Sequence, residues 1–204
     1  MPKPDIPRKT VYRLSLYQRC LQSLKANGTA TVSSAALAKA AGVKPSQLRK
    51  DLTLFGNFGT RGLGYSVDGL TTELNEVLGT AKLQPVILIG VGNLGSALLR
   101  YGGFNKEGFE IIAAFDPDLT PRPHSPVPVY SMNDLPEFVR KHGVKMAILT
   151  VPVHVAQGVV NSIIPHGIQA ILNFAPTLIS VPEGVWVNNV DLAVELENLS
   201  YFIR

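Results

Sequence analysis

The chain has 204 residues, 46% of them hydrophobic, which is enough to build one large core or two smaller ones. Its only cysteine, Cys20, excludes an intrachain disulfide and a cysteine metal cluster, and we expect no metal. The N-terminus has no apolar segment like that of a signal peptide, and no apolar run approaches the roughly 20 residues of a membrane span. We therefore expect a cytoplasmic protein with no membrane partner.

The charges are distributed unevenly along the chain. Residues 1–80 contain 11 lysines and arginines against 5 acids, whereas residues 81–204 contain 8 against 10. This asymmetry favours contact between the first segment and a polyanion, although an ordinary solvated basic surface would give the same counts. Together with the motifs below, it predicts a DNA-binding domain over 1–80, a nucleotide-binding domain over 81–190 and a terminal helix over 191–204.

The first eighty residues contain helix signals in close succession. Apolar residues recur at helical spacing over 11–24, which predicts a first helix. A second helix begins after Ser33 or Ser34, either of which can act as its N-cap. Gly42 suits a tight turn, and Pro45 suits the first turn of a third helix, where its missing N–H costs nothing. The segment is therefore a candidate helix-turn-helix.

The third predicted helix has the composition of a DNA-recognition helix. Ala38, Gly42 and Leu48 occupy the small, turn and apolar positions of a helix-turn-helix, and Leu48 must point inward. Four polar side chains near the start of the helix then face outward and become candidate DNA contacts: Ser46, Gln47, Arg49 and Lys50. The alternative is a helical hairpin with an exposed charged face.

A glycine-rich segment with interleaved aromatic and aliphatic residues follows at 55–65. Directly after a recognition helix, this pattern predicts a β-hairpin that serves as the wing of a winged helix. Thr60 and Arg61 lie at its tip, and Arg61 can enter a narrow A·T-rich minor groove. The alternative is a flexible linker, which would rarely contain so many large apolar residues.

The second segment opens with a dinucleotide fingerprint. A short apolar strand at 85–89 leads into Gly90-Val91-Gly92-Asn93-Leu94-Gly95 and then into a helix. A second strand ends at Asp116, about 20 residues further on, where a Rossmann acid bonds the ribose hydroxyls. The next residues are Pro117 and Asp118, and a 2′-phosphate would meet two carboxylates. NAD(H) is therefore favoured over NADP(H), unless Asp116 is only a turn residue before Pro117.

Two more predicted strands end beside polar and proline-containing loops. Ligands of parallel α/β sheets bind at the carboxyl ends of the strands. The residues expected to border the nucleotide are therefore Thr150, Val151, Pro152, Asn173, Ala175 and Pro176. The alternative is that these loops merely end their strands.

Residues suited to catalysis are scarce. Of the four histidines only His154 lies near a strand end, and it has no obvious carboxylate or lysine partner in the sequence. Hydride transfer usually needs an acid or base beside the substrate, so the pattern favours a nucleotide sensor over an enzyme. The last segment, 191–203, predicts an amphipathic helix with Asp191 as N-cap, which either folds back or docks on a second subunit.

The chain closely resembles the redox-sensing transcriptional repressor family Rex over about residues 10–203. Four stretches show the resemblance: Leu48-Arg49-Lys50-Asp51-Leu52, the segment 55–65 with Gly59-Thr60-Arg61-Gly62, the glycine fingerprint, and Ile171-Leu172-Asn173-Phe174-Ala175-Pro176. The resemblance implies an α/β protein with an N-terminal winged-helix domain and a Rossmann-like parallel-sheet domain. It also implies a homodimer with a swapped C-terminal helix, and operators near respiratory and fermentative genes.

By the same resemblance, Arg49, Lys50 and Arg61 would contact DNA. Arg19, Tyr101 and Asp191 match family positions that couple the nicotinamide site to DNA release. The leading hypothesis is thus a repressor that binds an inverted-repeat operator and releases it when NADH binds.

Three rival hypotheses remain at this stage. The chain could be a small NAD-dependent oxidoreductase that uses His154, a repressor that senses another nucleotide such as coenzyme A, or a constitutive architectural DNA-binding protein. An apolar pocket without a carboxylate facing the ring would penalise the cationic NAD⁺ and favour neutral NADH, which supports the redox sensor.

Overall fold

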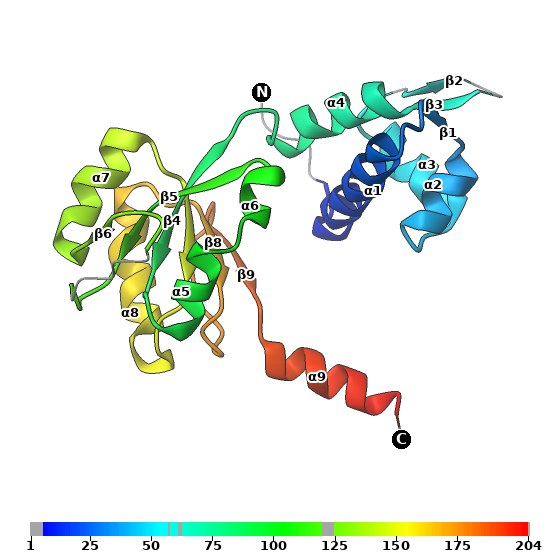
Figure 1. The fold of residues 1–204 in the computed structure, drawn as a ribbon. Helices are drawn as coiled ribbons and strands as arrows, with labels where there is room; N and C mark the ends of the chain where they lie inside the picture. The colour runs from blue at the N-terminus through cyan, green and yellow to red at the C-terminus, as the bar shows by residue number, and fades with distance from the viewer. Residues whose placement is uncertain (1–5, 57, 61–62, 120–124, 204) are drawn as a thin grey trace. The chain divides into compact units, whose positions relative to one another are not determined.

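The structure is a computed structural model that describes residues 6–56, 58–60, 63–119 and 125–203 (Figure 1). The chain folds as two compact units, Met1–Lys82 and Leu83–Arg204. The division lies two residues after the end of the predicted first domain, within a short connection between a helix and a strand. None of the described helices combines the length and the apolar character that crossing a membrane requires.

The N-terminal unit is a winged helix, as the sequence predicts. Its elements are α1 (Arg8–Ala26), β1 (Thr31–Val32), α2 (Ser34–Ala40), α3 (Pro45–Thr53), β2 (Gly59–Thr60), β3 (Gly64–Ser66) and α4 (Val67–Leu78). The three strands form an antiparallel sheet in the order β1-β3-β2, so β2 and β3 make the wing and β1 pairs with its inner strand.

Local sequence signals place α2 and α3. Ser33 is the N-cap of α2, and its Oγ accepts a hydrogen bond of 3.1 Å from the Ala36 N–H. Gly42 turns the chain with φ of +68°, a conformation that favours glycine, and Pro45 is the first residue of α3. Leu48 is fully buried in the core between the helices, as its predicted inward position requires.

The C-terminal unit is a doubly wound parallel sheet. Its elements are β4 (Gln84–Ile89), α5 (Asn93–Leu99), α6 (Gly103–Lys106), β5 (Phe109–Phe115), β6 (Val129–Tyr130), η1 (Met132–Asp134), α7 (Leu135–His142), β7 (Met146–Leu149), α8 (Val153–Ile163), η2 (Ile164–His166), β8 (Ala170–Asn173), β9 (Trp186–Asn189) and α9 (Leu192–Tyr201). The strands lie in the order β6-β5-β4-β7-β8-β9, and every neighbouring pair is parallel. Numbered along the chain, this is the Rossmann order 3-2-1-4-5-6, which reverses between β4 and β7.

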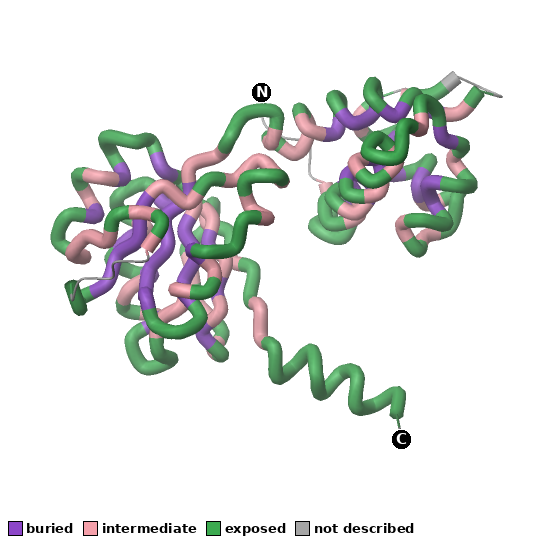
Figure 2. Tube along the Cα trace, viewed as in Figure 1, coloured by how far each residue is buried: buried purple, intermediate pink, exposed green. Residues whose placement is uncertain are grey.

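Each face of the sheet has its own core. Ile87, Phe115 and Leu149 pack with α7 and α8 on one face, whereas Leu88 and Ile148 pack with α5 and α6 on the other. Figure 2 shows the buried chain concentrated in the strands and the whole of α9 exposed. The chain thus alternates between the two faces and brings the ends of β4 and β7 together at the point of reversal.

The terminal helix α9 has no buried residue. Asp191 is its N-cap, as expected, and Asp191 Oδ1 accepts hydrogen bonds from the N–H groups of Ala193 (2.9 Å) and Val194 (3.3 Å). The apolar side chains of this segment are more than 40% exposed: Leu192, Val194, Leu196, Leu199, Phe202 and Ile203. The helix is therefore an amphipathic element without a covering partner among the described residues.

Candidate nucleotide site and nucleic-acid interface

Each of the three glycines after β4 has a different structural role. Gly90 turns the chain with φ of +95°, and a Cβ there would lie 2.7 Å from the carbonyl oxygen of Thr150. A Cβ on Gly95 would collide with the Gly90 carbonyl, so Gly95 allows α5 to pack against the turn. A Cβ on Gly92 would meet no heavy atom within 4 Å. These are the tight turn, close packing and open approach that a dinucleotide fingerprint provides around a pyrophosphate.

Asp116 lies directly after β5, with a carboxylate beside the glycine turn. The residue is 8% exposed, and its Oδ2 accepts a 2.5 Å hydrogen bond from the Val91 N–H. Its Oδ1 accepts from the Asp118 N–H at 2.8 Å, the geometry of a turn residue. The two interpretations of the sequence are thus compatible, because the turn itself holds the acid where a dinucleotide ribose lies in Rossmann domains.

The end of β7 is tied to the same turn. The Thr150 hydroxyl lies 2.6 Å from the Gly90 carbonyl oxygen and 3.1 Å from the Ile89 carbonyl oxygen. The Thr150 N–H donates to the same Ile89 carbonyl oxygen at 2.9 Å. Val151 is half-buried, and Pro152 is the exposed N-cap residue of α8. The Thr150 hydroxyl therefore holds the turn in place, while Pro152 lies at the accessible edge.

The end of β8 is held by the Asn173 side chain, which is fully buried. Asn173 Nδ2 donates to the carbonyl oxygens of Ala175 (3.0 Å) and Thr177 (2.9 Å) and to Asn189 Oδ1 (2.9 Å), and Asn173 Oδ1 accepts from the Ala175 N–H (2.9 Å). The amide is thus engaged by protein groups and shapes the loop that follows. Ala175 is buried and Pro176 is exposed, so the loop presents Pro176 at the strand ends.

The remaining fingerprint residues differ in exposure. Val91 is 4% exposed and packs in the core, whereas Leu94 is 38% exposed and Asn93, the first residue of α5, is also exposed. The accessible positions of the fingerprint are therefore Gly92, Asn93 and Leu94.

The outward face of α3 holds most of the predicted DNA contacts. Ser46, Arg49 and Lys50 are exposed, and Arg49 Nη1 donates to Ser34 Oγ at 3.1 Å. Gln47 is half-buried and its Nε2 donates to Asp51 Oδ1 at 2.9 Å, a use that the sequence did not indicate. Thr60 ends strand β2, and Arg61 lies outside the described residues.

A partly buried ion pair fastens α3 to α1. Asp51 is 1% exposed, and its two carboxylate oxygens accept from Arg13 Nε (2.6 Å) and Nη2 (2.7 Å). Tyr17 donates its hydroxyl to Asp51 Oδ2 at 2.8 Å. Burial alone would raise the pKa of Asp51, but the hydrogen bonds from Arg13, Tyr17 and Gln47 outweigh it and hold that pKa below its usual range. The sequence alone does not reveal this clamp, because Arg13 and Tyr17 lie 38 and 34 positions away from Asp51.

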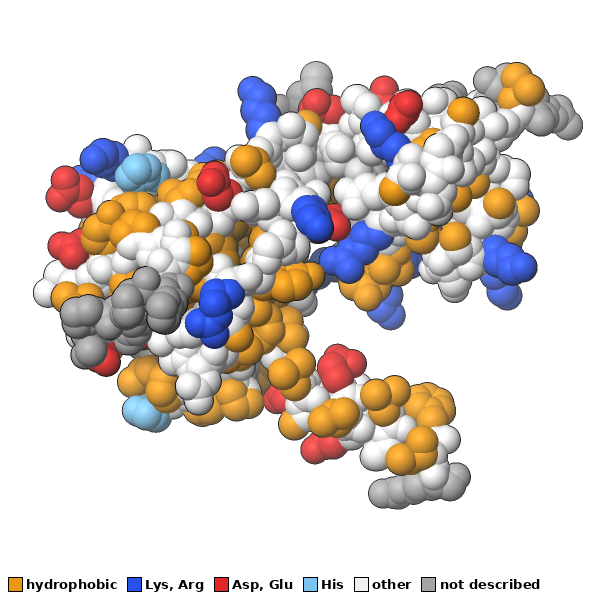
Figure 3. All heavy atoms as spheres, viewed as in Figure 1, with side chains coloured by type: hydrophobic (Ala, Val, Ile, Leu, Met, Phe, Trp, Pro, Cys, Tyr) orange, Lys and Arg blue, Asp and Glu red, His pale blue; other side chains and the backbone are white. Residues whose placement is uncertain are grey.

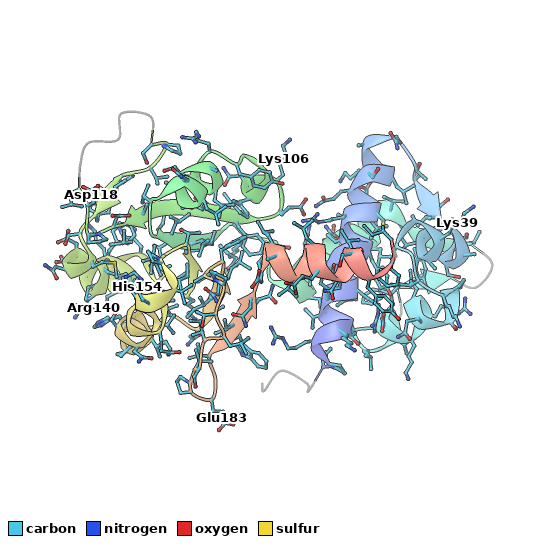
Figure 4. All side chains as sticks on the ribbon, turned by 90° about the horizontal axis from the view of Figure 1, so that it is seen from below. Lys39, Lys106, Asp118, Arg140, His154 and Glu183 are labelled. Carbon is cyan, nitrogen blue, oxygen red and sulfur yellow. The ribbon has the colours of Figure 1, made fainter. Side chains whose placement is uncertain are left out.

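Of the three residues assigned to coupling, one lies in the N-terminal unit and two lie in the C-terminal unit. Arg19 is exposed on α1 of the N-terminal unit. Tyr101 follows α5 in the C-terminal unit, is 59% exposed, and meets the Phe104 ring edge-on with centroids 5.1 Å apart. Asp191 caps α9. His154, the one candidate for acid–base chemistry, is an exposed residue in the first turn of α8 (Figure 4).

Family models match both units. The model described as "Putative DNA-binding protein N-terminus" matches residues 5–53. The model described as "CoA binding domain" matches residues 81–177.

Relatives match almost the whole chain. The redox-sensing transcriptional repressor Rex of Pelotomaculum thermopropionicum is 45% identical over 198 residues, which is 96% of this chain and 93% of the relative. The Rex protein of Carboxydothermus hydrogenoformans is 44% identical over 201 residues, covering 98% and 97%. Both relatives are named as redox-sensing transcriptional repressors, which agrees with the expectation of a sensor.

Two crystal structures have the same fold over the same length. The complex of the protein RSP with NAD⁺ and operator DNA superposes with a TM-score of 0.91 at 35% identity, covering 98% of this chain and 94% of RSP. The complex of RSP with NADH gives a TM-score of 0.87 at 32% identity, covering 98% and 95%. Identity of this extent over nearly the full length shows that the chain belongs to the Rex family of redox-sensing transcriptional repressors.

Proposed function

We propose that the protein represses transcription by binding operator DNA while NADH is scarce and releases that DNA when NADH binds. The observation that supports this most directly is the glycine turn with Asp116 at the reversal point of a parallel sheet, in one chain with a winged helix. RSP, a structural relative, has been crystallised with NAD⁺ and operator DNA and with NADH. We place the protein in the cytoplasm, the compartment that contains its operator.

The nucleotide is NAD(H). Gly92 leaves the turn open to a pyrophosphate, and Asp116 lies where it can accept hydrogen bonds from ribose hydroxyls. Asp118 adds a second carboxylate nearby, which disfavours the 2′-phosphate of NADP(H). The loops that follow β7 and β8 border the same edge through Thr150, Val151, Pro152, Asn173, Ala175 and Pro176.

The DNA contact is made by α3 and the wing. Arg49 and Lys50 are exposed on α3, and their charges suit guanine edges and phosphates in a major groove. Ser46 and the side-chain oxygen of Gln47 contribute hydrogen bonds to the DNA. Thr60 and Arg61 contact the minor groove. The Arg13–Asp51 ion pair holds α3 at a fixed angle, so these side chains are positioned before DNA arrives.

The functional unit is a homodimer in which α9 docks on the second copy. Figure 3 shows hydrophobic side chains along α9, and none of its residues is buried in the single chain. Strand β9, which precedes α9 in the chain, forms an edge of the sheet, and its Trp186 is 61% exposed. A second copy that covers both surfaces gives a two-fold dimer, which matches an inverted-repeat operator.

The redox response follows from charge. Oxidised nicotinamide is cationic and reduced nicotinamide is neutral, so an apolar pocket imposes a desolvation cost only on NAD⁺. NADH can shift the dimer only by its difference in affinity between the DNA-bound and DNA-free conformations. Arg19, Tyr101 and Asp191 are the residues that we assign to this coupling.

Fluorescence anisotropy of an inverted-repeat A·T-rich duplex, titrated at several NADH:NAD⁺ ratios and fixed salt, tests the proposal. We expect saturating NADH to weaken operator binding by roughly 5–150-fold, the usual range of a coupling between two sites. Equal operator affinity with and without saturating NADH would rule the proposal out.

Coenzyme A is the second candidate ligand, because residues 81–177 match a family model named for it. Asp116→Ala separates the two ligands, since NAD(H) offers the carboxylate the two free hydroxyls of its adenosine ribose, whereas the ribose of coenzyme A carries a 3′-phosphate that a carboxylate would repel. We expect this variant to bind NADH more weakly and to hold the operator at NADH concentrations that release the unaltered protein. Release by coenzyme A, together with unchanged NADH affinity in Asp116→Ala, would favour the second candidate.

A further inference from the structure

The Asn173 amide joins two parts of the C-terminal unit that are distant in sequence. On one side it closes the loop 174–177 by bonding the carbonyl oxygens of Ala175 and Thr177. On the other side it reaches Asn189, the last residue of β9, at 2.9 Å. Backbone pairing supports the same junction, because the Val190 N–H donates to the Asn173 carbonyl oxygen at 2.8 Å.

The junction lies directly before α9. Only Val190 and Asp191 separate Asn189 from Leu192, the first residue of the helix. The three Cα–Cα steps from Asn189 to Leu192 span at most about 11 Å of extended chain, so the range of positions open to the start of α9 is limited while the contact with Asn173 is kept. Asp191 also caps the helix, so the first turn of α9 is fixed to this short connection.

The chain that follows the loop 174–177 is held as well. Gln157 on α8 bonds both backbone groups of Ser180: its Nε2 donates to the carbonyl oxygen and its Oε1 accepts from the N–H, each at 2.9 Å. Because Asn173 holds the loop at its start and Gln157 holds Ser180 just after its end, a displacement of the loop is passed on to the groups that Asn173 contacts. A ligand that presses on Pro176 would therefore displace the loop together with Asn189, which Asn173 contacts.

We propose that Asn173 is a positioning residue that ties the base of α9 to the loop bordering the nucleotide, so that the state of the nucleotide edge is transmitted to α9 through Asn189. This inference rests on the proposed function and specifies one contact through which NADH acts. It predicts that breaking the Asn173–Asn189 bond weakens coupling while ligand binding and DNA binding each persist.

The bond can be removed without opening the loop. Asn173 Nδ2 has two protons and three acceptors, so Ala175 and Thr177 still satisfy both protons when Asn189 loses its amide. Asn189 is itself exposed, so Asn189→Ala leaves the fold intact. Asn189→Asp keeps an oxygen that can accept from Asn173 and serves as the rescue variant. Asn188→Ala is the matched control, because the adjacent exposed side chain points to the opposite face of the sheet.

The readouts are NADH affinity, operator affinity without NADH, and the factor by which saturating NADH weakens operator binding, each measured with the full chain and the inverted-repeat duplex. In Asn189→Ala we expect NADH affinity and operator affinity to stay within about twofold of the unaltered protein. The factor by which NADH weakens operator binding should fall about fivefold, as the loss of one hydrogen bond of ordinary strength implies. Asn189→Asp and Asn188→Ala should keep the full factor. Hydrogen exchange of the Ala193 and Val194 amides provides a second readout and should speed up only in Asn189→Ala.

The outcomes separate this inference from the proposed function. If NADH has no effect on operator binding by the unaltered protein, the proposed function itself is wrong. A normal NADH effect in Asn189→Ala, with unchanged exchange at α9, overturns the role of Asn173 and leaves the proposed function standing. Equal loss in Asn188→Ala assigns the effect to strand β9 as a whole and also overturns the inference. If Asn189→Ala does not fold, Asn189→Leu takes its place as the variant that lacks the acceptor. Equal effects of NADH on operator binding in Asn189→Asp and Asn189→Leu then overturn the inference.

Discussion

The glycines at positions 92 and 95 differ in what a methyl group would meet, and this allows binding and folding to be separated. A Cβ on Gly92 points into open space, and the residue has an ordinary φ of −71°, so Gly92→Ala fits the fold. We expect Gly92→Ala to retain its thermal midpoint and to lose at least about tenfold in NADH affinity, because the methyl group occupies the approach of the pyrophosphate. Calorimetric titration with NADH and a thermal melt measure the two effects.

Gly95→Ala serves as the contrast. Its methyl group would collide with the Gly90 carbonyl and lie 2.9 Å from Thr150 Oγ1, so the turn and α5 must separate. We expect a lower thermal midpoint as well as lost affinity, at a cost of roughly 1–3 kcal/mol for overpacking. Wild-type NADH affinity in Gly92→Ala would show that the ligand does not approach the turn at this position.

The Asp51 carboxylate makes the stability of the N-terminal unit depend on pH. Its pKa is lower in the folded chain than the value of about 4 expected when unfolded, so its contribution is fully present above that value. The contribution is lost as pH falls through the folded pKa. We expect Asp51→Asn to flatten the acid limb of a stability curve measured by circular dichroism between pH 3 and pH 8. It should also cost roughly 3 kcal/mol at neutral pH, because Arg13 then stays partly buried without its partner.

The pair Lys25–Asp68 provides the control for this prediction. Its atoms are 2.8 Å apart, but the two side chains are 60% and 75% exposed. Exposed ion pairs contribute less than about 1 kcal/mol, so Asp68→Asn should leave both the curve and its acid limb nearly unchanged. The same acid limb in Asp51→Asn as in the unaltered chain would contradict the role of the clamp.

At the scale of single residues, the sequence predicts what depends on neighbours in the chain. Ser33 and Asp191 can be recognised as caps because each bonds an N–H two or three positions on. Asp51 cannot be paired with Arg13 in this way, because only the packing of α1 against α3 brings them together. The inward turn of the Asn173 amide also depends on a residue 16 positions away.

At the scale of elements, buried strands are predictable and the exposed edge is not. Apolar runs identify β4, β5, β7 and β8, because side chains on both faces of these strands pack into the two cores. Strand β9 reads Trp-Val-Asn-Asn and has mostly exposed side chains, so neither an apolar run nor an alternation marks it. Its place next to β8 is decided by backbone pairing.

Helix α9 provides a test of whether Asp191 acts through its cap or through its charge. Asp191→Ala removes both hydrogen bonds to the first turn, which should destabilise the helix by about 1 kcal/mol, whereas Asp191→Ser keeps a capping oxygen. If Asp191 takes part in coupling through its negative charge, which both substitutions remove, both variants reduce the effect of NADH on operator binding. Anisotropy titrations with and without NADH measure that effect, and hydrogen exchange in α9 reports the cap. A normal effect in Asp191→Ser would restrict the residue to capping.

At the scale of the whole molecule, the order of motifs predicts two units but not their assembly. A helix-turn-helix followed by a glycine fingerprint indicates a DNA reader joined to a nucleotide binder, and the strand order of the second unit confirms the Rossmann-like fold. The exposed apolar face of α9 indicates a partner surface, but a sequence pattern does not specify which copy the helix covers. The coupling that we propose between the two units is therefore a property to be measured in solution, together with the oligomeric state.

Thermodynamic linkage makes this coupling testable from both directions. If NADH and operator DNA select two states of one dimer, the factor by which NADH weakens DNA binding must equal the factor by which DNA weakens NADH binding. We expect the two factors to agree within about twofold when both are measured at the same salt concentration, which must be fixed because DNA affinity falls steeply with salt.

The second factor comes from nicotinamide fluorescence. The protein is titrated with NADH in the presence of saturating operator or of a scrambled duplex of equal length. The scrambled duplex controls for nonspecific binding, because only the operator requires the DNA-bound arrangement of both recognition helices. Unequal factors would mean that NADH acts on a species other than the operator-binding dimer, such as a dissociated subunit.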